Sequence, residues 1–232
     1  MTTIGNNIHK VHARIAAACA VAGRPPHSVR LLAVSKTFGA RDVQEAVAAG
    51  QQAFGENYLQ EGVEKVEALA GTGIEWHCIG PIQSNKTRLA ATHFDWVHSV
   101  DRLKIAERLS AQRPEGRPPL DICLQVDIDG GPNKSGVSPA DLPALAHAVA
   151  ALPGLRLRGL MTIPEPQPDI GAQRAVHART RALFAALVAG GLALDTLSMG
   201  MSADLEAAVM EGSTMVRVGT AIFGGRTPPA AA

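Results

Sequence analysis

A lysine at the end of an apolar run is the first residue of this sequence that could do chemistry. Lys36 closes the segment LLAVSK, residues 31–36. Lysine is almost never fully buried without a partner or a role. Its amine can form a Schiff base with an aldehyde when burial or a neighbouring cation lowers its pKa from about 10.4. An ion pair with a neighbour such as Glu56 is the structural alternative.

Two segments near the C-terminus have the composition of a phosphate site. They are SMGMS, residues 198–202, and RVGT, residues 217–220. Hydroxyl groups, a guanidinium and glycines that let backbone N–H groups approach a ligand all favour an anion. We also expect Ser202 to cap the helix that follows it. The charges of Asp204 and Glu206 would oppose an anion.

The elements that must position these residues alternate along the chain. A helical pattern over 6–22 ends at Gly23 and precedes the first strand. Eight short β-type runs follow, over 29–36, 52–57, 74–80, 94–100, 120–128, 155–163, 194–200 and 214–219. Helical patterns separate them, over 41–49, 58–70, 85–92, 101–112, 139–151, 171–189 and 202–211, and a short segment at 221–225 closes the series.

Eight strand and helix units of roughly 29 residues each predict a parallel sheet. We expect an α/β fold, a single (β/α)₈ TIM barrel with an extra N-terminal helix, forming one domain over residues 1–226. A doubly wound open sheet is the alternative, but the first turn, SKTFGARD, lacks the glycine fingerprint of a dinucleotide fold. A barrel builds its site at the carboxyl ends of its strands. Candidates there are Lys36, Asn57, His77 with Gly80, Ser99, Asp127, Met161 with Thr162, Ser198 with Gly200, and Arg217 with Gly219.

Composition excludes several classes of function. The 232 residues are 46% hydrophobic and 19% charged, with a formal net charge of +1. This balance gives no bias toward nucleic acid or acidic membranes. The three cysteines form no CxxC pair, so we expect reduced, buried thiols. With no leader-like start and no long apolar tract, the sequence predicts a cytoplasmic protein, and we expect a monomer.

Six motifs in order resemble one known family. They are AVSKTFG, FGENYLQE, EWHCIGPIQSNK, GLMTIPEP, LSMGMSADLEAAV and GSTMVRVGTAIFGGR, and the resemblance covers roughly residues 8–226. Together they are similar to the pyridoxal phosphate homeostasis protein family. The resemblance implies a barrel like that of alanine racemase, pyridoxal 5′-phosphate (PLP) held as a Schiff base, and no established catalysis. It also implies a role in the cellular supply of PLP, with PLP-requiring apoenzymes as possible partners.

The resemblance assigns roles to individual residues. Lys36 would carry the Schiff base, Asn57 would lie beside the cofactor ring, and His77 would lie on or near the barrel floor. A core histidine with satisfied hydrogen bonds is an equal alternative for His77. The phosphate neighbours would be Ser198 and Ser202, the backbone of Met199 and Gly200, and Gly219 and Thr220.

Arg217 would face the pyridine nitrogen of the cofactor. A guanidinium only donates hydrogen bonds, so it keeps that nitrogen unprotonated. An unprotonated ring is a poor electron sink, which discourages carbanion chemistry. The alternative for Arg217 is a salt bridge in the barrel interior.

Two enzymatic functions remain as alternatives. A PLP-dependent amino-acid racemase would need a second proton-transfer group opposite the lysine, and Tyr58 is the single tyrosine of the chain. A Schiff-base lyase without a cofactor would need a carboxylate near Lys36, for which Asp127 or Glu56 could serve.

Two segments lie outside these motifs. Residues 129–136, DGGPNKSG, match a variable loop of the family, and Lys134 within it is either solvated or a second site for PLP. We expect the tail, residues 227–232, to be disordered.

Overall fold

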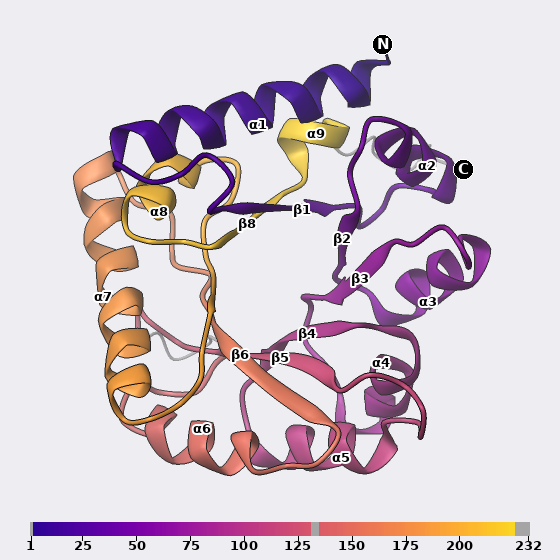
Figure 1. The fold of residues 1–232 in the computed structure, drawn as a ribbon, viewed down its shortest axis with the longest axis vertical. Helices are drawn as coiled ribbons and strands as arrows, with labels where there is room; N and C mark the ends of the chain where they lie inside the picture. The colour runs from indigo at the N-terminus through magenta and orange to yellow at the C-terminus, as the bar shows by residue number, and fades with distance from the viewer. Residues whose placement is uncertain (1, 131–134, 226–232) are drawn as a thin grey trace, which may run out of the picture.

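The computed structural model describes residues 2–130 and 135–225 (Figure 1). Lys134 and the predicted tail lie outside these residues. Eight parallel strands pair in chain order, and β1 also pairs with β8, so the sheet closes into a barrel. The strands are β1 (Arg30–Val34), β2 (Ala53–Glu56), β3 (Glu75–Cys78), β4 (Trp96–Val100), β5 (Leu120–Gln125), β6 (Leu155–Met161), β7 (Thr196–Ser198) and β8 (Met215–Val218). The predicted (β/α)₈ barrel is confirmed.

Helices surround the barrel, as the view in Figure 1 shows. They are α1 (Thr3–Val21), α2 (Ala40–Ala48), α3 (Leu59–Ala68), α4 (Thr87–His93), α5 (Leu103–Gln112), α6 (Leu142–Ala150), α7 (Ile170–Ala189), α8 (Leu205–Met210) and α9 (Thr220–Phe223), with a 3₁₀ turn over Ser84–Lys86. The predicted extra helix is α1, and it packs against α2, α8 and α9. No helix among the described residues is long and apolar enough to span a membrane.

The strands are buried on both faces, which explains their continuous apolar runs. In β1, Leu31 and Ala33 belong to the large outer core between barrel and helices, whereas Leu32 and Val34 pack in a separate interior cluster. This alternation continues past the end of the strand. It puts Ser35 toward the helices and Lys36 toward the barrel mouth.

The cysteines and the short helix α8 bear on two smaller predictions. Cys19, Cys78 and Cys123 are free and buried, as predicted. Burial raises the pKa of the Cys78 thiol to about 12, so this thiol is inert. The predicted cap at Ser202 is wrong, because α8 begins at Leu205 and its N-cap residue is Asp204. The carboxylate of Asp204 instead accepts a hydrogen bond from the backbone N–H of Met201, which closes a turn before the helix.

Candidate functional site

A cavity of about 510 Å³ opens at the carboxyl ends of β1, β2 and β8. Six of the ten predicted site residues line it: Lys36, Asn57, Ser202, Arg217, Gly219 and Thr220. Its apolar lining includes Val34, Phe38, Ile79, Ile163 and Met201. The barrel register explains this grouping, because Val34 pairs with Gly55 while Ala33 pairs with Val218. The ends of β2 and β8 therefore lie on either side of Lys36.

Lys36 stands between two anchored residues. Behind it, Ser35 donates its hydroxyl to Glu56, and its carbonyl accepts a hydrogen bond from Lys65 Nζ at 2.8 Å. Lys65 also forms the ion pair of Glu56, with Nζ 2.8 Å from Oε1. Burial raises the pKa of Glu56, and the charge of Lys65 opposes that rise. These contacts fix the backbone just before Lys36.

The residue after Lys36 has an unusual backbone. Thr37 has φ 69°, a left-handed conformation that non-glycine residues adopt rarely. Its backbone N–H donates to Glu61 Oε1 at 2.6 Å, and Glu61 also pairs with Lys65. One ionic cluster, formed by Glu56, Glu61 and Lys65, therefore holds both neighbours of Lys36.

Asn57 follows β2, and its position depends on a glycine that follows β3. A Cβ atom at Gly80 would lie 2.0 Å from the carbonyl oxygen of Asn57. Only glycine lets the two backbones come this close. The side-chain oxygen Oδ1 of Asn57 is buried and has no hydrogen-bond partner among the described residues. Such an orphaned acceptor at a cavity wall is a group that a ligand donor can satisfy.

Arg217 carries a buried positive charge to the base of the cavity. The residue is 4% exposed, and its guanidinium donates to the carbonyl and hydroxyl oxygens of Ser198 and to the carbonyl of Thr162. All three acceptors are neutral. Burial lowers the pKa of Arg217 to about 10, so the group stays charged at neutral pH. The predicted alternative, a salt bridge in the barrel interior, is not formed among the described residues.

The acidic residues next to SMGMS have partners of their own. Asp204 Oδ2 lies 2.9 Å from His177 Nε2, and Glu206 forms an ion pair with Arg14 of α1 at 2.8 Å. Because these carboxylates are paired, they oppose an anion less than the sequence suggests.

Four predicted residues lie away from the cavity wall. Ser198 is fully buried and turns its hydroxyl toward Arg217 and His98. The backbone N–H of Met199 already donates to the carbonyl of Met215. Gly200, with φ 93°, packs so closely that a Cβ atom would lie 2.4 Å from that of Ala208. These three residues support the cavity from behind.

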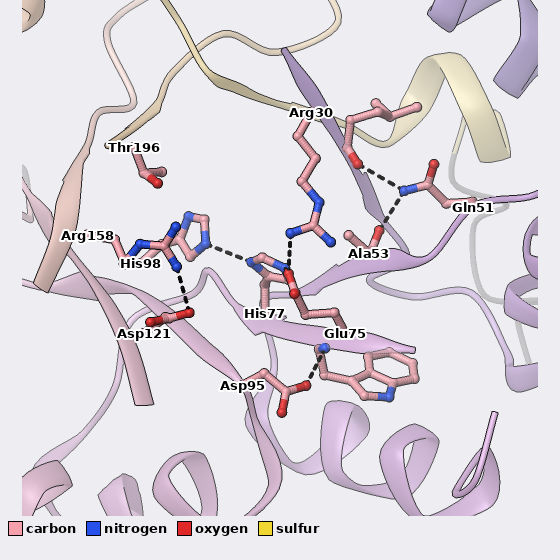
Figure 2. A network of polar contacts seen from close by, with 12 residues as sticks. Arg30, Gln51, Ala53, Glu75, His77, Asp95, His98, Asp121, Arg158 and Thr196 are labelled. Atoms are coloured by element: carbon pink, nitrogen blue, oxygen red, sulfur yellow. Dashed lines mark hydrogen bonds and ion pairs between the residues drawn. The ribbon is translucent and has the colours of Figure 1, made fainter. Parts of the chain in front are cut away.

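His77 is the fourth, and it belongs to the barrel interior. The residue is 0% exposed, and both ring nitrogens have partners, Glu75 at 2.6 Å and His98 at 2.9 Å (Figure 2). The structure thus agrees with the alternative of a core histidine with satisfied hydrogen bonds.

Several residues of the site are given no role by the sequence motifs, although Phe38 lies within AVSKTFG. Phe38 lines the cavity and stacks on Phe223 with ring centroids 5.1 Å apart. His98 lies in an apolar run with no motif around it, although its spacing from Trp96 would place both on one strand face. Met201 was covered by the SMGMS motif but was not singled out.

A second cavity of about 610 Å³ adjoins the first and shares Asn57 with it. Tyr58, Lys86, Ser99 and Arg102 line this second cavity. Tyr58 lines this second cavity and not the first.

Comparison with known proteins defines the class. A family model described as alanine racemase, N-terminal domain, matches residues 7–227. The alanine racemase structure from Corynebacterium glutamicum is 21% identical with a TM-score of 0.65, and this chain covers 62% of its length. That likeness shows a shared fold. The chain is a single barrel of the alanine racemase N-terminal class, with a lysine and a buried arginine at its mouth.

Closer relatives narrow the class to one family. The pyridoxal phosphate homeostasis protein of Pseudomonas aeruginosa is 62% identical over 226 residues, which is 97% of each chain. That of Escherichia coli K12 is 52% identical over 97% of this chain and 98% of its own. The solved structure of PipY from Synechococcus elongatus with PLP bound is 41% identical, with a TM-score of 0.83, and the match covers 95% of this chain and all of PipY. The chain belongs to the pyridoxal phosphate homeostasis protein family.

Proposed function

We propose that this chain binds PLP in the cavity between β1, β2 and β8, holds it as a Schiff base on Lys36, and serves in PLP homeostasis without catalytic turnover. The observation that carries the proposal is the arrangement of Lys36 and the buried Arg217 on the walls of one cavity. Membership of the family and the PLP bound to PipY support it.

The residues of the cavity fit the chemistry of this ligand. PLP is an anionic aldehyde with a flat heteroaromatic ring. Arg217 offers a buried cation with neutral partners, Asn57 offers a buried acceptor, and Ser202, Gly219 and Thr220 offer polar groups at the mouth. The apolar side chains of Val34 and Ile79 can contact the faces of a ring.

When bound, PLP supplies an aldehyde that condenses with a lysine amine and releases water. Lys36 is the lysine that lines the cavity. Arg217 would donate to the ring nitrogen, since a guanidinium has no acceptor, and would so keep that nitrogen unprotonated. Ser202 and Thr220 would donate to the phosphate. This set of groups binds and orients a cofactor without supplying an electron sink.

The enzymatic alternatives find little support in the site. Among the described residues that line the first cavity there is no carboxylate. Asp127 accepts a hydrogen bond from the backbone of Gly130, and Glu56 faces Lys65. Tyr58 is 53% exposed and lines the second cavity. The groups that a lyase or a racemase would need are therefore placed elsewhere.

The proposed phosphate-binding role of Ser202, Gly219 and Thr220 is tested by comparing PLP with pyridoxal. Pyridoxal lacks several charge-assisted hydrogen bonds of about 1.5–3 kcal/mol each, so we expect it to bind at least about a hundredfold more weakly. The measurement is a titration of the purified protein, followed by the absorption of the bound chromophore. Equal affinities would show that Ser202, Gly219 and Thr220 do not hold the phosphate.

A further inference from the structure

An unbroken series of hydrogen bonds runs through the barrel interior, from the cavity to the opposite barrel face. Arg217 Nη1 lies 2.8 Å from Ser198 Oγ, which lies 2.9 Å from His98 Nδ1. His98 Nε2 lies 2.9 Å from His77 Nδ1, and His77 Nε2 lies 2.6 Å from Glu75 Oε1 (Figure 2). These four contacts join residues of β8, β7, β4 and β3. We call the five residues the interior chain: Arg217, Ser198, His98, His77 and Glu75.

The two ends of the interior chain fix the direction of its hydrogen bonds. Arg217 can only donate. Glu75 can only accept when ionised, and Arg30 lies 2.6 Å from its carboxylate at the far end. Burial alone would raise the pKa of Glu75, but the hydrogen bond from His77 and the charge of Arg30 lower it, so the carboxylate is ionised at neutral pH.

The two histidines between these ends have one consistent arrangement of protons. Both are 0% exposed, and burial lowers the pKa of each, so each ring carries one proton. His77 must donate from Nε2 to Glu75, which leaves Nδ1 as an acceptor. His98 must then donate from Nε2 to His77, which leaves its own Nδ1 as an acceptor. Ser198 therefore donates its hydroxyl to His98, and its oxygen accepts from Arg217.

The surroundings keep these rings in place. Trp96 stacks on His77 with ring centroids 5.2 Å apart and an interplanar angle of 15°. The guanidinium of Arg158 lies 4.6 Å over Trp96 and pairs with Asp121 at 2.9 Å. Trp96 therefore covers one face of His77, and both histidine rings are fully buried, so packing as well as hydrogen bonds restricts their rotation.

We propose that His98 and His77 are positioning residues for Arg217, because they commit the Ser198 hydroxyl to one direction and so hold the guanidinium in one orientation. Three N–H groups of Arg217 donate to Ser198 and Thr162, and the residue also lines the cavity. The inference rests on the proposed binding of PLP, since the ligand that Arg217 would contact is the pyridine ring.

The first test examines the interior chain itself and needs no cofactor. Nitrogen NMR of the full-length protein reports which ring nitrogen of each histidine carries the proton. At neutral pH we expect His77 and His98 both neutral and both protonated at Nε2. A proton on Nδ1 of either ring, or a cationic ring, would overturn the proposed direction.

The second test uses two substitutions that each keep one of the two hydrogen-bonding positions of His98. In His98→Asn the side-chain oxygen can take the place of Nδ1 and accept from Ser198. In His98→Gln the amide can take the place of Nε2 and reach only His77. Both lose one buried contact, so a merely structural role would affect them alike. We expect His98→Gln to weaken PLP binding about tenfold and to shift the nitrogen resonance of the ring nitrogen of labelled PLP. His98→Asn should stay within about threefold of the unchanged protein.

The outcomes separate the inference from the proposed function. Equal affinities and equal ring-nitrogen resonances in the two variants would contradict the positioning role. If either variant fails to fold, the tautomers of the unchanged protein still test the direction of the hydrogen bonds, on which the positioning role depends. If the unchanged protein binds no PLP, the proposed function is refuted. The measurement of the histidine tautomers would still test the hydrogen bonds of the interior chain.

Discussion

The backbone at Lys36 is held in place by contacts of the two residues beside it. Its neighbours Ser35 and Thr37 are bound by Glu56, Glu61 and Lys65, a cluster on the outer side of the sheet. The sequence indicated that Lys36 could pair with Glu56. The ion pair of Glu56 is formed with Lys65, a residue of α3 that lies in none of the six motifs. Helix periodicity shows that Lys65 lies near Glu61, but it cannot show that its ammonium is buried against β2.

We predict that Lys65→Met destabilises the protein by about 3–5 kcal/mol. Side chains of Lys65 and Glu56 are 6% and 0% exposed, so the substitution leaves a buried carboxylate without its partner. Urea unfolding measures the loss. Arg102→Met is the matched control, since its ion pair with Asp101 is exposed and should contribute less than about 1 kcal/mol. Equal losses in the two variants would show that the cluster is not a buried anchor.

Strands and helices are the scale at which the sequence was most informative. An apolar run that ends in a polar residue marks both a buried strand and its carboxyl end, so Lys36, Asn57 and Gly219 could be placed at the barrel mouth. His77 could not be placed in this way. Strands of a barrel are staggered, so the distance of a residue from its strand end does not give its height along the barrel axis. His77 lies within β3, and Ser198 ends β7 yet points inward.

The strands β3 and β4 carry two neutral histidines, and this predicts a pH dependence of stability. Burial lowers the pKa of His98 well below 6.5, and the charge of Arg217 adds to the effect. Burial also lowers the pKa of His77, which Glu75 partly offsets. Below about pH 6.5 these groups take up protons in the unfolded chain but not in the folded one. The free energy of unfolding should therefore decrease as the pH is lowered below about 6.5, by at most about 1.4 kcal/mol per pH unit for each histidine.

Urea unfolding between pH 7.5 and 5 measures this slope. His98→Asn removes one of the two groups, so its slope should be shallower than that of the unchanged protein. A variant with the same slope would show that His98 does not stay neutral in the folded state.

In the barrel as a whole, the groups that line the cavity lie at the mouth, and the polar groups that support them lie in the interior. Its mouth gathers Lys36, Asn57 and Arg217 around one cavity, while its interior holds the polar chain that ends at Glu75. The sequence motifs predicted the mouth because each motif lies at a strand end. They did not predict the link between mouth and interior, because Ser198 and His98 are 100 residues apart and meet only when the barrel closes.

Borohydride reduction tests whether Lys36 holds PLP covalently. Reduction makes the Schiff base permanent, so the mass of the cofactor should appear on the peptide that contains Lys36. A Lys36→Ala variant should carry no such label under the same conditions. We expect the label on Lys36 in the unchanged protein. A label on Lys86 or Lys134, with Lys36 unmodified, would contradict the proposed Schiff base on Lys36.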